Sequence, residues 1–145
     1  MTSIDFHVNL ADKLAHACRL VRKAQRAGRR LVVCSEDAAL LARFDQALWT
    51  FSALDFVPHV FAHDVLAAET PVVLATPAVR GETLPHHDVL VNLGGAQPGF
   101  FSGFERMIEL VGTDETDRAA ARERFRFYRD RGYALQTFDA AGDAG

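Results

Sequence analysis

Three short and almost wholly apolar runs constrain the fold of this chain more than any other feature. They span Arg30 to Cys34, Val72 to Ala75 and Val89 to Asn92. Strands that are buried on both faces of a parallel sheet have this composition. Ser3 to Asn9 and Tyr133 to Phe138 instead alternate apolar and polar residues, which indicates two half-buried strands. The chain therefore contains at least five predicted strands, and three of them are interior.

Segments with helical periodicity separate these strands. We expect helices at about residues 11–27, 36–48, 101–110 and 115–131. Gly28 and Gly132 are suited to end the first and the last of them, and Ser35 is suited to cap the second. Strands that alternate with helices predict an α/β fold: a single three-layer Rossmann-like domain, mostly parallel, with helices on both faces of the sheet. This domain spans residues 1–145, with residues 140–145 frayed.

Composition narrows the function classes. Hydrophobic residues make up 49% of the chain and charged residues 24%, as in soluble globular proteins. The formal net charge of -3 gives no overall attraction to nucleic acid, so any such role is local or indirect. Cys18 and Cys34 lie in apolar surroundings and are expected to be buried thiols of a reducing cytosol. The sequence has no secretion signal and no apolar run of about 20 residues, so we expect a cytoplasmic protein without a membrane partner.

A nucleotide site is the first alternative for such a fold, but the turns do not favour it. The turn after the first strand lacks glycine, which the dinucleotide-binding fingerprint requires. The turn that holds Gly94 and Gly95 has no P-loop ending, and Pro98 interrupts its amide donors. A plain strand-to-helix turn is the favoured interpretation of this segment.

Catalytic and metal-binding patterns are equally sparse. His86-His87-Asp88 is the best candidate, but adjacent residues of an extended segment point to opposite sides. His59 and His63 have helical spacing without a third ligand, and His7 and His16 are isolated in the sequence. We therefore expect no catalytic residue, no metal and no cofactor in this chain.

The last predicted helix carries the most informative pattern. A helical wheel places four arginines within an arc of about 80°. These are Arg118, Arg122, Arg126 and Arg129. Phe125 borders the arc, so the helix offers cations beside an aromatic edge. This combination suits an acidic ligand with an apolar end, although a solvated basic face or a phosphate-backbone site would show the same pattern.

A second pattern lies between residues 44 and 59. The segment holds the single tryptophan of the chain, three further aromatic residues and a proline across a predicted helix end and loop. Trp49 and Phe56 are residue types that dominate binding hot spots. They would serve equally well to cover the edge of the sheet, and the sequence leaves both interpretations open.

Several blocks of the chain, taken in order, resemble the chi subunit family of bacterial DNA polymerase III. The similar blocks are residues 4–8, 28–37, 41–49, 56–59, 71–74, 88–93 and 118–132. They cover almost the whole chain, and their order and spacing are more specific than any single block. The resemblance implies a non-catalytic accessory subunit of a DNA-directed DNA polymerase, which links the clamp loader to single-stranded DNA-binding protein during replication.

The resemblance also implies two binding surfaces. Chi proteins hold the acidic, phenylalanine-ended tail of single-stranded DNA-binding protein, and the matching positions here are Arg118, Arg122, Phe125 and Arg126. Arg118 and Arg126 stand where the best-known members have lysine, and Phe125 stands where they have tyrosine. The psi subunit, or another clamp-loader component, would bind at a second surface, formed by Trp49, Phe56 and Pro58. Contact with nucleic acid would be indirect.

Overall fold

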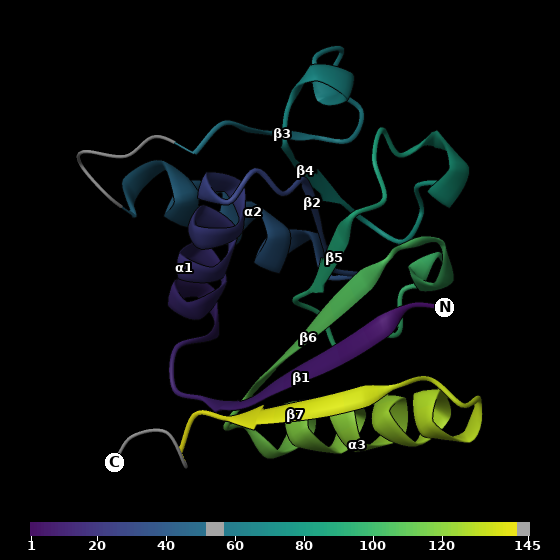
Figure 1. Cartoon of the computed structure of the whole chain (residues 1–145). Coiled ribbons are helices and arrows are strands. Elements are labelled where there is room, and N and C mark those ends of the chain that lie inside the picture. Colours follow the sequence, from purple (N-terminus) through teal and green to yellow (C-terminus); the bar gives the residue numbers. More distant parts are fainter. Residues whose placement is uncertain (52–56, 142–145) are drawn as a thin grey trace.

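The computed structural model describes residues 1–51 and 57–141. Its centre is a sheet of seven parallel strands in the order β3-β4-β2-β5-β6-β1-β7 (Figure 1). The strands are β1 (Ser3–Leu10), β2 (Leu31–Cys34), β3 (His59–Phe61), β4 (Val72–Ala75), β5 (Val89–Asn92), β6 (Arg106–Gly112) and β7 (Leu135–Asp139). The helices are α1 (Lys13–Arg26), α2 (Ala38–Thr50) and α3 (Glu115–Asp130), with short 3₁₀ segments η1 (Ala67–Glu69), η2 (Gly81–Thr83) and η3 (Phe101–Gly103).

The sheet is covered on both faces, which confirms the predicted three-layer α/β fold. Side chains of α1 and α2 pack in one apolar cluster with alternate residues of β2, β4 and β5. Side chains of α3 pack in a second cluster against the other face, together with residues around η1, η2 and η3. All the strand pairs are parallel, so the sheet is more uniform than the mostly parallel sheet that the sequence predicts.

The central strands follow from their composition. Every side chain of β2, β4 and β5 is buried, and Leu31 of β2 lies in register with Val72 and Val89 on its two sides. Side chains on both faces of such a strand are removed from water, so continuous apolar sequence is required. The three runs that dominate the sequence therefore form the middle of the sheet.

Aspartate side chains cap the N-termini of α1 and α2. The Asp12 carboxylate accepts a hydrogen bond from the Ala15 amide at 3.0 Å, and Gly28, with a φ of 81°, follows the last turn of α1. The predicted cap of the second helix is wrong by two residues. Asp37 caps α2, and the Ser35 hydroxyl instead accepts a hydrogen bond from the Asp37 amide at 3.0 Å.

The predicted helix at residues 101–110 is wrong. Only the 3₁₀ turn η3 forms there, and Arg106–Gly112 is the strand β6, with a run of buried side chains from Met107 to Val111. Glu109 stands in the middle of this run and makes the sequence resemble an amphipathic helix. Its carboxylate is satisfied inside the protein, so a charged residue occupies a central strand.

The two edges of the sheet differ from the prediction in smaller ways. β3 has three residues and was not predicted, because so short a strand shows no periodicity. β7 is the opposite edge and is mostly exposed. The Ala140 amide donates to the Val8 carbonyl at 3.0 Å, while residues 142–145 lie outside the described residues, so a frayed end stays a prediction.

Candidate functional site: a groove beside the last helix and an aromatic surface

A groove of about 470 Å³ lies between α3 and the strands β1, β6 and β7. It is lined by Phe6, Val8, Asn9, Val111, Arg118, Ala121, Arg122, Phe125 and Thr137. Phe125 is anchored on the sheet, because its ring lies 5.3 Å from the ring of Phe6 in an edge-to-face arrangement. The groove therefore has an apolar floor and two guanidinium groups along its helix side.

The groove brings three of the four predicted tail-binding residues together. Arg118, Arg122 and Phe125 line it, whereas Arg126 does not. Arg126 lies one turn further along α3 and forms an ion pair with Glu123 at the surface. The predicted set of residues thus divides into three at the groove and one beside it.

The arginines of α3 are less isolated than the helical wheel indicates. Arg122 donates to Glu115 at 2.6 Å, and Arg129 lies 3.3 Å from Asp130. The hydrogen bond from Arg122 lowers the pKa of the Glu115 carboxyl. The acidic side chains of the helix therefore reach round to the basic stripe and offset its self-repulsion. Ion pairs that are this exposed stabilise a protein little, so an incoming carboxylate could replace them at low cost.

Asn9 fixes the position of Arg118 at the end of β1. Its side-chain oxygen accepts a hydrogen bond from Arg118 at 2.7 Å, and its amide nitrogen donates to Asp139 at 2.8 Å. Asn9 has a φ of 58°, a left-handed backbone conformation that asparagine tolerates better than most residues. Sequence reasoning missed this residue, because it took Asn9 as the last residue of an ordinary alternating strand.

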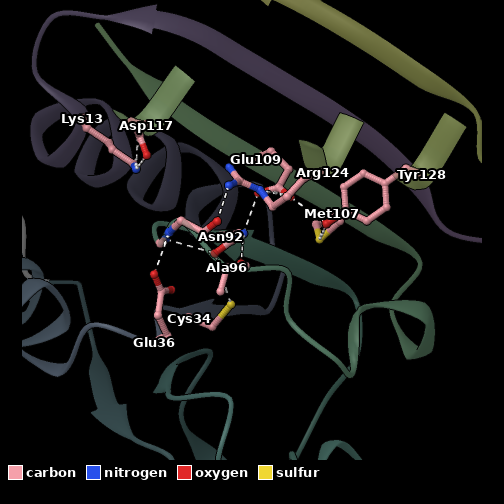
Figure 2. Close-up of polar contacts among 12 residues, drawn as sticks. Lys13, Cys34, Glu36, Asn92, Ala96, Met107, Glu109, Asp117, Arg124 and Tyr128 are labelled. Carbon is pink, nitrogen blue, oxygen red and sulfur yellow. Dashed lines mark hydrogen bonds and ion pairs between the residues drawn. The ribbon is translucent and has the colours of Figure 1, made fainter. Parts of the chain in front are cut away.

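A buried polar network holds α3 against the sheet (Figure 2). Glu109 is fully buried and accepts hydrogen bonds from Asn92 at 2.6 Å, Arg124 at 3.0 Å and Tyr128 at 2.7 Å. Arg124 also donates to the Gly95 carbonyl at 2.6 Å. Burial raises the pKa of the Glu109 carboxyl, and Arg124 opposes that shift. Sequence reasoning missed this network, although a lone glutamate in an apolar run is a usable signal.

The glycine turn after β5 has its amides occupied by the protein itself. The Gly94 amide donates to the Asn92 side chain at 3.0 Å, and the Gly95 amide donates to Glu36 at 2.9 Å. A Cβ atom at Gly94 would lie 1.9 Å from a carboxylate oxygen of Glu36. This carboxylate fills the place next to the turn and would repel a phosphate. The predicted strand-to-helix turn is wrong in one respect, because the turn leads to the 3₁₀ segment η3 and the strand β6 and not to a helix.

Trp49 forms the centre of the predicted second surface. It lies near the end of α2, is 51% exposed and places its ring 4.9 Å from that of His59. Pro58 is half-buried and adjoins His59 in the chain. Phe56, the third predicted residue of this surface, lies outside the described residues. The structure thus leaves a large aromatic side chain in water at the β3 edge of the sheet, on the face that α1 and α2 cover.

The histidines do not assemble a metal site. His59 contacts the Val57 carbonyl at 2.7 Å and Asp45 at 2.9 Å, which occupies both ring nitrogens. His87 contacts the Gly81 carbonyl at 2.8 Å. Across residues 1–51 and 57–141, no group of three or more histidine, cysteine, aspartate or glutamate side chains could hold a metal ion.

His7 and His16 are not isolated, contrary to the sequence prediction. Their rings share a hydrogen bond of 2.9 Å between Nδ1 and Nε2, because α1 returns over β1. Burial lowers the pKa of both imidazoles. This pair is a structural contact between α1 and the sheet.

The geometry defines a Rossmann-like domain that has a groove with apolar and cationic walls on one face and an exposed tryptophan on the other. Within the described residues, no helix is long and apolar enough to cross a membrane. Residues 1–136 match the family model of the DNA polymerase III chi subunit, HolC, so the chain belongs to the DNA polymerase III chi subunit family.

Named relatives agree with this assignment. The chain is 40% identical to DNA polymerase III subunit chi of Pseudomonas aeruginosa over 140 residues, which cover 94% of this chain and 95% of that protein. It is 31% identical to DNA polymerase III subunit chi of Escherichia coli over 120 residues, which cover 83% and 80%. It is 30% identical to the protein of the same name from Haemophilus influenzae over 121 residues, which cover 83% of each.

Proposed function

We propose that this chi subunit is a non-catalytic cytoplasmic adaptor, which links the clamp-loader complex to the C-terminal tail of single-stranded DNA-binding protein. The groove beside α3 is the observation that carries this proposal. Its floor is apolar, and Arg118 and Arg122 lie along its rim. A tail that is acidic along its length and ends in phenylalanine has the matching chemistry.

In the proposed complex, tail carboxylates meet Arg118, Arg122 and Arg126, and the terminal phenylalanine enters the slot that Phe125 borders. Exposed charge-assisted contacts contribute about 1 kcal/mol each, so we expect micromolar affinity that weakens with salt. Weak single contacts suffice, because many copies of the binding protein coat the DNA and raise the effective concentration of the polymerase.

Two other functions are less well supported. A nucleotide-dependent enzyme would need free amides at the Gly94–Gly95 turn, and those amides are bonded within the protein. A phosphate backbone bound along the α3 stripe would leave the apolar floor of the groove without a partner. The formal net charge of -3 also gives no overall attraction to nucleic acid.

Calorimetric titration with a peptide that carries the acidic tail tests the proposal. We expect micromolar binding of this peptide and none of a copy that lacks the final phenylalanine. Arg122→Ala should weaken binding tenfold or more, which is a loss of at least about 1.4 kcal/mol. Arg129→Ala is the matched control, because Arg129 lies on the same helix outside the groove. Unchanged affinity in Arg122→Ala, with the fold verified by circular dichroism, would remove the groove from the proposal.

The second partner, the psi subunit or another clamp-loader component, would bind at Trp49, Phe56 and Pro58. Trp49 supports this assignment, because it exposes half of a large aromatic side chain. Trp49→Ala should impair docking on the clamp loader and leave tail affinity unchanged. Loss of tail binding in this variant would show that the two surfaces have been assigned the wrong way round.

A further inference from the structure

A second basic surface lies on α1, on the face of the sheet opposite the groove. Between Lys13 and Arg30 the chain carries seven lysine and arginine residues and no aspartate or glutamate. The whole chain has a formal net charge of -3, so this one segment is positive within an acidic protein. Such an asymmetry creates a local field that the net charge conceals.

The helix directs these charges to one side. Ala17, Cys18 and Val21 are the buried residues of α1 and face the sheet. Arg19, Lys23 and Arg26 are exposed and recur at the spacing of neighbours on one helix face. Positions four residues apart lie about 6 Å apart along the axis, so the cations form a track.

The track borders a hollow with an aromatic wall. A depression of about 220 Å³ is lined by Arg19, Arg22, Lys23, Arg26 and Phe51. The Arg22 guanidinium lies over the Phe51 ring, 5.8 Å from its centroid. Arg22 thus covers one face of the ring, and the hollow places several cations beside the aromatic side chain.

The cations between Lys13 and Arg30 are partly neutralised, because Lys13 forms an ion pair with Asp117 at 3.1 Å. In the part of the chain that the structure describes, Arg19, Lys23 and Arg29 form no ion pair. Arg30, at the end of the segment, lies 3.3 Å from Asp88. Three of the exposed arginines of α3, by contrast, are paired with carboxylates of their own helix.

We propose that the exposed face of α1 binds the phosphate backbone of single-stranded DNA. A track of cations beside an aromatic ring is the combination that sequence-independent single-strand binding uses. An acidic protein partner is the less favoured occupant, because protein interfaces concentrate apolar and aromatic residues at their centre. Among the described residues that line this hollow, the half-buried Phe51 is the only residue of that kind. The inference does not depend on the tail-binding groove.

Fluorescence anisotropy of a labelled thymidine oligonucleotide with the full chain at low salt tests the proposal. We expect weak binding, with a slope of log affinity against log salt of about -2 if three phosphates are neutralised. Arg19→Glu/Lys23→Glu should reduce affinity at least about tenfold, and Arg19→Gln/Lys23→Gln should reduce it less. Arg80→Glu/Arg129→Glu makes the same change in net charge away from α1 and should change affinity less than about twofold.

Three results would overturn this inference. One is the absence of binding at low salt, and another is an equal loss in the α1 and control variants, which would indicate only the net charge. The third is that a polyglutamate peptide binds more tightly than the oligonucleotide and that its binding is also lost when Arg19 and Lys23 are replaced. This result would identify an acidic protein as the occupant. The tail peptide should bind the α1 variants unchanged, so failure here is distinguishable from failure of the groove.

Discussion

Replacing Arg124 by methionine would leave the carboxylate of Glu109 in the core without its cation. Arg124 is 4% exposed and Glu109 is 0% exposed, so solvent cannot take the place of the lost partner. Removing one member of a buried ion pair costs about 3–5 kcal/mol. Hydrogen bonds from Tyr128 and Asn92 remain, so we expect a loss near the lower end, about 3 kcal/mol.

Two comparisons calibrate this value. Tyr128→Phe removes one hydrogen bond to the same carboxylate and should cost about 1.5 kcal/mol. Arg129→Met removes an exposed arginine from the same helix and should cost less than about 0.5 kcal/mol. Urea unfolding followed by circular dichroism gives the free energies of unfolding from the midpoints and slopes.

The pH dependence provides an independent check. Burial already raises the pKa of Glu109 above its ordinary value of 4.5, and loss of Arg124 raises it further. In the variant, the folded protein then keeps a proton that the unfolded chain has released, so the free energy of unfolding increases as the pH falls. The deficit of Arg124→Met relative to the wild type should shrink between about pH 7 and pH 5. If the loss in the free energy of unfolding is below about 1 kcal/mol, or does not change with pH, then Arg124 does not stabilise the fold by compensating the buried charge of Glu109.

Three further predictions follow from single contacts. Burial lowers the pKa of His7 and His16, so below about pH 6.5 the unfolded chain binds protons that the folded protein excludes. The free energy of unfolding should therefore fall as the pH drops below that value. In urea titrations at pH 5 and 7, His16→Gln should show a smaller fall than the wild type. Burial raises the pKa of Cys18 to about 11, so about one Cys18 thiol in a thousand is ionised at pH 8. Because only the thiolate reacts, a chromogenic disulfide reagent should modify Cys18 at least about a hundredfold faster in the urea-unfolded chain than in the folded protein. Both Asn9→Gly and Asn9→Ala remove the hydrogen bond that holds Arg118, so calorimetry should show weaker tail binding for each variant. Glycine accepts the left-handed backbone, whereas alanine is strained there by about 1 kcal/mol. Urea unfolding should therefore show lower stability for the alanine variant alone.

The interior strands could be predicted from sequence, because burial on both faces requires apolar residues at almost every position. β2 and β4 are apolar throughout and β5 is apolar up to Asn92, and apolar runs this short between turns are typical of strands because helices are longer. β6 was not predicted, because its apolar run is interrupted by Glu109, which gives the segment the pattern of an amphipathic helix. The partners that stabilise the buried glutamate lie on β5 and α3, and local sequence does not show them.

The site could be predicted only as far as local periodicity extends. Arg118, Arg122 and Phe125 share one side of a helix, so a wheel finds them. The wheel does not find Asn9 or Thr137, which line the same groove from other elements. Their contribution depends on β1 and β7 lying side by side, a pairing that the sequence does not specify.

The strand order bears directly on an adaptor function. The groove lies over β1 and β7, and Trp49 contacts His59 of β3 at the other edge of the sheet. Five intervals of about 4.8 Å separate β3 from β1, the middle strand of the groove, so the two surfaces are roughly 24 Å apart across the sheet. The helices that carry them, α2 and α3, cover opposite faces of the sheet (Figure 1). Ligands at the two surfaces would neither collide nor share a contact residue, so the two affinities should be independent. The proposed adaptor function would use this independence, because two partners could then be bound at the same time without a conformational change.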